Sequence, residues 1–186
     1  MTASVAADPG RQAIIDALER HEVDYLVIGA AAAEALGWSG RSEDIDIVPD
    51  MSATNLDRLS KALNELDAKL IGDPAYPGGV PVPAGFDARL LATKQVWNLM
   101  TQQGQLDITS HPSGTGGYSD LIGRAIKRNI PGTTTAVSVA SARDIIASKT
   151  AAGRPKDIAM LPALRRELER WLHPEDPSTS RTGCVS

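Results

Sequence analysis

Residues 25–48 read YLVIGAAAAEALGWSGRSEDIDIV, and this stretch holds the clearest structural pattern in the chain. The aliphatic and β-branched run over 23–28 predicts a strand, which Gly29 ends. Alanine-rich residues 30–36 favour a helix. Over 44–48, acidic residues alternate with isoleucine and valine, the period of a strand that has one polar and one apolar face. The stretch therefore predicts a strand, a glycine turn, a helix and a second strand.

The second of these strands brings two carboxylates together. Asp44 and Asp46 are separated by one residue, so both project from the same face while Ile45 points into the core. Carboxylates are the hard oxygen ligands that Mg²⁺ prefers, and Mg²⁺ also bridges to substrate phosphates. Asp107, between apolar neighbours in a strand predicted over 105–109, supplies a third carboxylate. The three predict a site for two metal ions, with Asp107 placed to orient or deprotonate an attacking hydroxyl. Acidic residues at solvated strand ends are the alternative explanation.

Two further segments have the chemistry of a phosphate site. A strand that ends in Gly29 at the start of a helix lets a phosphate approach backbone N–H groups. The late segment ASKTAAGRPKD, residues 147–157, supplies cations. Lys149 is predicted to neutralise charge on a leaving pyrophosphate, although a solvated surface lysine is the ordinary alternative. Asp157 either holds Lys149 or Arg154 in place or stabilises the first turn of the last helix.

Periodicity and helix-breaking residues predict the remaining elements. The helices are expected over 12–20, 52–67 (capped by Ser52), 118–128, 141–152 (capped by Ser141) and 155–172, and the strands over 87–92, 96–100 and 136–139. Residues 71–85 are dense in proline and glycine and predict a loop. Residues 1–172 are expected to form one domain, with a catalytic sheet at about 23–110 and a helical part at about 117–172. Residues 173–186 are expected to be a disordered tail.

Composition narrows the class of protein. The chain has 186 residues, of which 42% are hydrophobic, and it holds no run of 18 apolar residues that would predict a membrane span. Residues 1–10 lack a secretory pattern, and a single cysteine, Cys184, builds no disulfide framework and does not fit a prenylation box. A cytoplasmic protein is expected. The three histidines lack the spacing of a zinc site, and no P-loop motif is present.

Charge is distributed unevenly along the chain. Residues 1–110 hold 8 basic and 16 acidic residues, whereas residues 111–186 hold 11 basic and 7 acidic ones. A site with carboxylates on one wall and phosphate-binding cations on the other would have this polarity. Separately solvated faces would give the same counts.

These residues resemble a known signature. Gly29-Ala30, a spacer, the Asp44/Asp46 pair and the distant Asp107 resemble the motif of nucleotidyltransferases of the DNA polymerase β-like superfamily, over residues 23 to about 157. Within that superfamily, Lys149 and Asp157 with the segment AAGRPKD look like the AbiEii/MenT branch, the nucleotidyltransferase toxins of bacterial toxin–antitoxin systems.

The resemblance implies a fold and an activity. The fold would be α/β (α+β), a small mixed sheet flanked by helices, with a helical C-terminal part. The activity would be Mg²⁺-dependent transfer of a nucleoside monophosphate from an NTP to an acceptor hydroxyl, in the toxin branch the 3′ end of tRNA. Translation would stop, and a cognate antitoxin protein would be a partner.

The resemblance also implies roles for individual residues. Metal ligands would be Asp44, Asp46 and Asp107, and Lys149 and Asp157 would complete the catalytic set. Nucleotide contacts would come from Gly29, Ala30, Arg41, Ser42, Lys149 and Arg154. Ala30 departs from the usual serine or glycine, so only a backbone contact is expected there. A phosphate on Ser42 would repel the NTP, which suggests regulation by phosphorylation.

The acceptor is left open by the sequence. Two basic groups favour RNA, one of Arg124, Lys127 and Arg128 and one of Arg165, Arg166 and Arg170, each on a predicted helix. Trp38 and Trp97 are candidates for base stacking, although tryptophan is more often a core residue. The alternatives are transfer to a protein or small-molecule hydroxyl, including an antibiotic, and a non-catalytic binding module of the same fold.

Overall fold

The computed structural model describes residues 7–72 and 74–172, and its sheet is built around the two strands predicted within 25–48. β1 (Tyr25–Ile28) and β2 (Asp44–Pro49) run antiparallel, with Ile28 opposite Asp46. α2 (Gly29–Ala35) connects them. The central unit is therefore the strand, glycine turn, helix and strand that the sequence predicts.

β2 also pairs with the strand that carries the third aspartate. β6 (Gly104–Thr109) lies parallel to β2, and Asp46 is the direct partner of Asp107 in this register. β5 (Val96–Thr101) runs antiparallel to β6 and places Asn98 opposite Asp107. The hairpin turn between β5 and β6 thus sets which polar side chain stands beside the third aspartate.

Further strands extend the sheet at both edges. β3 (Lys69–Leu70) and β4 (Val80–Pro81) extend it beyond β5, and β8 (Ala136–Val139) and β7 (Ile126–Asn129) extend it beyond β1. β8 is parallel to β1, whereas β7, β3 and β4 run antiparallel to their neighbours. Over residues 7–72 and 74–172 the result is a mixed eight-stranded sheet with the order β4-β3-β5-β6-β2-β1-β8-β7.

Alternation along β2 and β6 gives these two strands one apolar face. Ile45 and Leu106 are partners across β2 and β6, as are Ile47 and Ile108, and all four are buried. Because successive side chains of a strand point to opposite faces, the aspartates of β2 and β6 project from the other face. Burial of the isoleucines therefore fixes the direction of the carboxylates.

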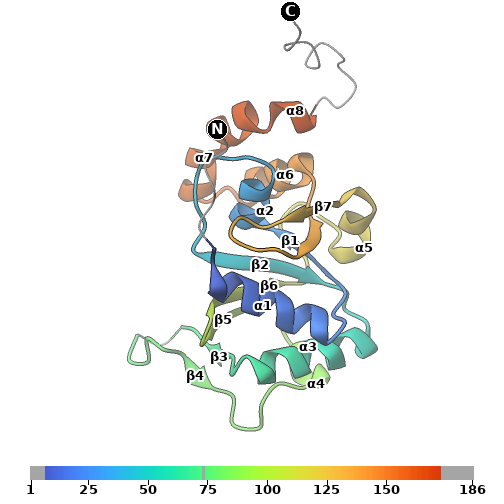
Figure 1. Ribbon diagram of the computed structural model, residues 1–186, viewed down its shortest axis with the longest axis vertical. Coiled ribbons are helices and arrows are strands. Elements are labelled where there is room, and N and C mark those ends of the chain that lie inside the picture. Colours follow the sequence, from blue (N-terminus) through green and yellow to red (C-terminus); the bar gives the residue numbers. More distant parts are fainter. Residues whose placement is uncertain (1–6, 73, 173–186) are drawn as a thin grey trace, which may run out of the picture.

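Helices cover the sheet, and the C-terminal ones gather at the end of the molecule opposite to α3 (Ala53–Glu65) and α4 (Ala88–Leu91) (Figure 1). α1 (Pro9–Arg20) contacts α3 and β6, and it crosses in front of the central strands in Figure 1. α6 (Ala142–Ala152) contacts α2, and α7 (Pro155–Glu167) and α8 (Glu169–Leu172) contact α6. The C-terminal helices lie together beyond β1 (Figure 1).

Two predicted elements are wrong. Residues 87–92 form the short helix α4 (Ala88–Leu91) rather than a strand, because the Asp87 carboxylate accepts a hydrogen bond from the Leu90 N–H and caps a helical turn. The helix predicted over 118–128 ends early. α5 (Tyr118–Leu121) passes into a 3-10 turn, η1 (Ile122–Arg124), and the next residues pair with β8 as strand β7. The part at about 117–172, expected to be helical, therefore contains two strands of the sheet.

The other predicted elements are confirmed with small changes in their bounds. Ser141 caps α6 by accepting a hydrogen bond from the Asp144 N–H, whereas Ser52 stands at the N-cap of α3 without a side-chain bond. The helix predicted over 155–172 is divided at Leu168 into α7 and α8, and Ile158, expected on its apolar stripe, is 56% exposed. The loop predicted over 71–85 contains β4.

The predicted tail at 173–186, with Cys184, lies outside the described residues. Within the described part of the chain, every helix is too short or too polar to cross a bilayer.

Candidate active site

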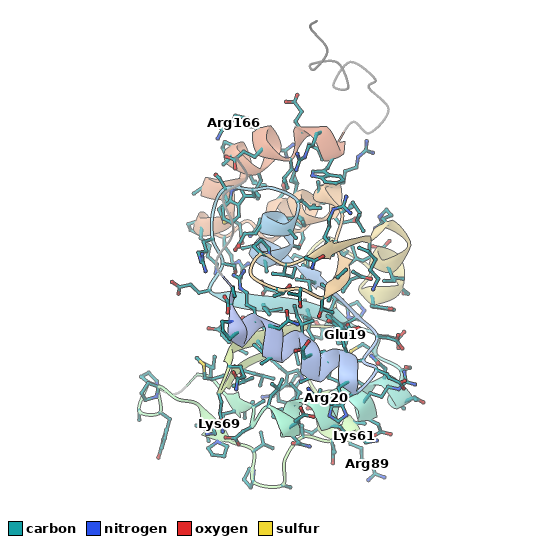
Figure 2. The ribbon with its side chains drawn as sticks, viewed as in Figure 1. Glu19, Arg20, Lys61, Lys69, Arg89 and Arg166 are labelled. Atoms are coloured by element: carbon teal, nitrogen blue, oxygen red, sulfur yellow. The ribbon has the colours of Figure 1, made fainter. Side chains whose placement is uncertain are left out.

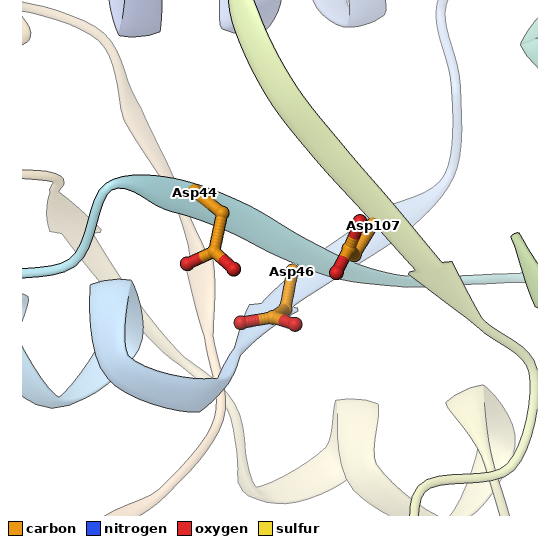
Figure 3. A group of neighbouring side chains, drawn as sticks. All are labelled: Asp44, Asp46 and Asp107. Atoms are coloured by element: carbon orange, nitrogen blue, oxygen red, sulfur yellow. The ribbon is translucent and has the colours of Figure 1, made fainter. Parts of the chain in front are cut away.

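Three carboxylates converge on the polar face of the sheet. Asp44 and Asp46 extend from β2 and Asp107 extends from the neighbouring β6 (Figure 3). One carboxylate oxygen from each residue lies within 4.8 Å of the other two. The parallel register, in which Asp46 is the partner of Asp107, holds the two strands' side chains on the same side. The structure thus brings together the three residues that the sequence predicts as metal ligands.

Burial and mutual repulsion make this group of carboxylates unfavourable without a cation. Burial, with added repulsion from Asp44 and Asp107, raises the pKa of Asp46 from its ordinary value of 3.8 to about 7. Burial also raises the pKa of Asp107. A divalent cation held by hard oxygen ligands would remove this repulsion. The donor set therefore fits Mg²⁺ both in its chemistry and in its electrostatics.

Gly29 lets the backbone pass directly beside Asp46. Its φ of +74° lies in the left-handed region, and a Cβ atom at this position would stand 2.3 Å from Asp46 Oδ2. Only glycine combines that conformation with so close an approach. Ala30 follows in the first turn of α2, and both residues line the cleft in front of the carboxylates.

The late segment faces the carboxylates from α6 and α7. Lys149 Nζ lies 3.0 Å from Asp157 Oδ1, and Arg154 Nε donates to Asp157 Oδ2. The Asp157 side chain is fully buried, whereas that of Arg154 is 61% exposed. Although burial acts to raise the pKa of Asp157, hydrogen bonds from Arg154 and Lys149 hold it below its ordinary value. Asp157 therefore anchors both cations, as one of the two sequence interpretations expects.

Arg41 and Ser42 lie apart from the cleft. Arg41 is exposed and does not line it, so its predicted nucleotide contact stays a prediction. Ser42 is buried, and its hydroxyl donates a hydrogen bond to Asp44 Oδ1 at 2.6 Å. This side chain is therefore directed at a predicted metal ligand. A modifying enzyme would reach the Ser42 hydroxyl only if the loop before β2 opened.

The cleft itself has a volume of about 420 Å³ and lies between the sheet and α6–α7. It contains the three aspartates, Lys149, Arg154 and Asp157. Residues that the sequence analysis assigned no role also line it: Asn98, Thr109, His111, Ser113, Ser148 and Lys156. Lys156, like Lys149, lowers the pKa of Asp46 by its charge. The two strands predicted over 96–100 and 105–109, joined by a short connection, are the sequence signal for a hairpin, and the register of that hairpin places Asn98 opposite Asp107.

The residues expected to bind RNA come from different elements, and Arg128 of β7 and Arg170 of α8 meet on the ring of Trp171. Lys127 and Arg128 lie on strand β7 rather than on a helix, and Arg124 is paired with Asp120 and Asp144. The remaining group is on the C-terminal helices, where Arg165 and Arg166 are exposed on α7 and Arg170 stacks on Trp171. Figure 2 shows Arg166 at the end of the molecule opposite to Lys61 and Arg89.

Neither tryptophan named for base stacking is freely exposed. Trp97 is only 4% exposed and packs edge-on against Phe86, with ring centroids 5.9 Å apart. It is a core residue, as is usual for tryptophan. Trp38 is partly buried against the hydrophobic core.

Comparison with known proteins gives a consistent picture of the fold. No protein-family model matches the sequence, and no curated protein resembles it closely enough to count as a match. Several solved structures, by contrast, do match the fold of this chain. The lincomycin-bound lincosamide antibiotic adenylyltransferase LnuA superposes with a TM-score of 0.56 at 16% identity, over 86% of this chain and 97% of that chain.

The antibiotic-resistance factor ANT(2'')-Ia gives the same result. The solution structure of ANT(2'')-Ia matches with a TM-score of 0.55 at 13% identity, over 86% of this chain and 83% of that chain. Its complex with adenylyl-2''-tobramycin matches with a TM-score of 0.52 at 15% identity, over 83% and 85% of the two chains. At 13–16% identity, the likeness shows the fold. The chain therefore has the mixed α/β fold of the lincosamide antibiotic adenylyltransferase LnuA and of the antibiotic-resistance factor ANT(2'')-Ia.

Proposed function

We propose that this protein is a metal-dependent nucleotidyltransferase, which moves a nucleoside monophosphate from an NTP to an acceptor hydroxyl. One observation carries the proposal: Asp44, Asp46 and Asp107 present carboxylate oxygens within 4.8 Å of one another on the floor of a cleft. The opposite wall carries Lys149 and Arg154. A carboxylate floor under a cationic wall is the arrangement that a metal–triphosphate complex needs.

The carboxylates would hold Mg²⁺, and two ions are proposed. When bound, the metal would stabilise negative charge on the reacting phosphate and lower the pKa of the acceptor hydroxyl. The residues of the chain have separate tasks. Asp44 and Asp46 would bind the metal, Gly29 lets the backbone that faces the triphosphate pass beside Asp46, and Lys149 faces the departing pyrophosphate.

The proposed reaction balances without a further reactant. A bond forms between the acceptor oxygen and the α-phosphorus of the NTP, and the bond from that phosphorus to the pyrophosphate oxygen breaks. The proton of the hydroxyl passes to a carboxylate, for which we propose Asp107. Lys149, held by Asp157, neutralises charge on the leaving pyrophosphate.

For the acceptor, one proposal is the 3′ end of tRNA, which would make the protein a toxin with a cognate antitoxin. It rests on the resemblance of the segment 151–157 to the AbiEii/MenT branch. The exposed cations Arg165 and Arg166 on α7 support it, because cations on one surface attract a phosphate backbone.

A small hydroxylated molecule is the second candidate, and the structural comparison favours it. Both solved relatives named above act on, or are bound to, antibiotics, and LnuA matches over nearly its whole length. In addition, several of the basic residues expected to follow an RNA backbone already have partners, since Arg124 is paired with Asp120 and Asp144 and both Arg128 and Arg170 stack on Trp171. Transfer to a protein hydroxyl is the third outcome that an experiment should recognise.

The test is a transfer assay with Mg²⁺ and each NTP labelled on its α-phosphate. Total bacterial RNA, a panel of hydroxylated antibiotics and a protein extract are offered separately, with Asp107→Asn as the control. Label on tRNA that disappears in the control supports the toxin, and label on an antibiotic supports the small-molecule enzyme. No label on any acceptor, with no pyrophosphate released, contradicts nucleotidyl transfer.

A further inference from the structure

Every polar group of Ser42 has a partner. Its hydroxyl donates to Asp44 Oδ1 at 2.6 Å and lies 3.0 Å from the Asp44 carbonyl oxygen. Its backbone N–H donates to Glu34 Oε1, and its backbone carbonyl accepts a hydrogen bond from Arg11 Nη2. Ser42 is only 6% exposed. The residue is thus clamped between a predicted metal ligand and two charged side chains.

Those two side chains form a buried ion pair between α1 and α2. Arg11 Nη1 lies 3.2 Å from Glu34 Oε2, and each side chain is 7% exposed. Arg11 also donates to the Pro131 carbonyl at 3.4 Å, and its Nε lies 3.5 Å from Asp8 Oδ2. The guanidinium therefore ties α1, α2 and the loop before β8 to the backbone of Ser42.

Stability alone does not account for such a pair. Apolar residues of similar volume often stabilise a protein as well as a buried ion pair does, because both charges must be taken out of water. What an apolar pair lacks is directional bonding. Arg11 and Glu34 use their direction to fix both backbone groups of one residue, Ser42, which stands two positions before Asp44.

The segment that enters β2 needs such an anchor. The connection from α2 is held by hydrogen bonds as far as Ser39, whose N–H donates to Glu167 Oε2, and Ser42 is the next residue whose backbone groups are bound by side chains. Asp44 is the first residue of β2, where the ladder of the sheet begins. Without the hydrogen bond from Ser42, the Asp44 side chain would be free to rotate.

We propose that Arg11 and Glu34 are positioning residues for the metal ligand Asp44, and that they act through Ser42. The ion pair fixes the Ser42 backbone, the fixed backbone aims the hydroxyl, and the hydroxyl engages Oδ1 of Asp44. The second carboxylate oxygen is then held toward Asp46 and Asp107. This inference rests on the proposed function, since a ligand needs such positioning only where the carboxylates hold a metal.

Metal binding itself gives the test, independently of transfer. Free Mn²⁺ is measured by electron paramagnetic resonance as it is titrated into the purified protein. Ser42→Ala is expected to weaken Mn²⁺ binding about 10-fold, the usual effect of removing a group that holds a ligand, and Glu34→Gln to weaken it similarly. Ser42→Thr keeps the hydroxyl and is expected to retain most of the affinity.

Asn55→Ala is the matched control for lost stability. Asn55 is 1% exposed and bonds the Asp24 and Asp50 backbone at the other end of β2, so its loss lowers Tm without touching the carboxylates. Wild-type affinity in this control, beside weakened Ser42→Ala and Glu34→Gln, supports the inference.

Three outcomes would overturn it, and they differ in meaning. Wild-type affinity in Ser42→Ala and Glu34→Gln removes the positioning role and leaves the proposed function intact. Equal weakening in Asn55→Ala assigns the effect to general destabilisation. Binding that is as weak in the wild type as in Asp46→Asn contradicts the metal site, and with it both proposals.

Discussion

Asp46 and Asp107 are direct partners across the parallel strands β2 and β6, and they share one face of the sheet. The apolar partners on either side of them, Ile45 with Leu106 and Ile47 with Ile108, are buried on the opposite face. A shift of the register by one residue would bury the carboxylates and expose the isoleucines. The hydrophobic core therefore dictates the geometry of the proposed metal site, and that geometry carries a cost that can be measured.

Asp46→Asn should stabilise the metal-free protein while it abolishes transfer. Burial raises the folded pKa of Asp46 to about 7, so between about pH 4 and 7 only the folded protein holds the Asp46 proton. The contribution of Asp46 to the free energy of unfolding therefore falls as pH rises through this range. In EDTA at pH 8 the variant should be more stable by about 2–4 kcal/mol in urea unfolding, and the gain should vanish near pH 4. Mg²⁺ should stabilise only the wild type.

The neighbouring Glu43 provides the control for that experiment. It is exposed and precedes Asp44, so Glu43→Gln removes one negative charge without relieving a buried one. A stabilisation by Glu43→Gln equal to that of Asp46→Asn would assign the effect to net charge instead of to the packed carboxylates.

Gly29→Ala should disrupt the site through a direct collision with Asp46. The new Cβ atom would stand 2.3 Å from Asp46 Oδ2, on a backbone with φ of +74°. Gly104→Ala is the comparison, because Gly104 also has a positive φ, of +136°, but has no atom within 4 Å of its Cβ position. Gly29→Ala should cost about 2 kcal/mol more in unfolding free energy than Gly104→Ala, and it alone should lose activity. An equal loss of unfolding free energy in Gly29→Ala and Gly104→Ala would contradict the expected collision with Asp46.

Asp157→Asn should destabilise the protein in a pH-dependent way. Arg154 and Lys149 hold the pKa of Asp157 below its ordinary value of 3.8, so the stabilisation is complete above pH 4 and is lost as pH falls through the lower, folded pKa. The variant leaves Lys149 without its buried counter-charge, so at any pH from 5 to 8 its free energy of unfolding should be about 2–4 kcal/mol below that of the wild type. Urea titrations should show the two proteins converging below pH 4. A difference that persists unchanged at pH 3 would contradict the ion-pair explanation.

Lys149→Gln should lower kcat/KM about 100-fold, because the proposed role of this ammonium group is to neutralise the departing pyrophosphate. Lys61→Gln is the matched variant, since Lys61 is exposed on α3 at the far end of the molecule (Figure 2). Steady-state kinetics with the acceptor found in the transfer assay measures both. Equal rates for Lys149→Gln and the wild type would remove Lys149 from the reaction.

Arg165→Glu/Arg166→Glu should separate the two acceptor classes. With RNA as acceptor, reversal of two exposed charges on α7 should weaken labelling at least about 10-fold and flatten its dependence on salt. With a small acceptor, the rate should not change. Lys61→Glu/Arg89→Glu reverses two charges at the opposite end and should affect neither reaction.

The local parts of this fold were predictable from sequence, and the long-range ones were not. Alternation over 44–48 and the glycine after β1 gave the central unit and the direction of Asp44 and Asp46. The strand predicted over 87–92 is wrong because the capping hydrogen bond of Asp87 stabilises a helical turn in this short apolar run. Residues 126–129 were misassigned because their pairing with β8 depends on a distant strand.

The site shows the same division. Asp107 was recognisable as an acidic residue between apolar neighbours, and Lys149 and Asp157 by their spacing. The link from Arg11 through Glu34 and Ser42 to Asp44 follows no local period, because its members come from α1, α2 and the loop before β2. Only the packing of these elements brings them together.

The most direct test of the central claim is anomalous diffraction from crystals grown with Mn²⁺ and a non-hydrolysable NTP analogue. The account predicts manganese peaks in contact with Asp44, Asp46 and Asp107, and a triphosphate that reaches from Gly29 toward Lys149. Manganese bound elsewhere, or an analogue that leaves the three carboxylates without metal, would contradict it.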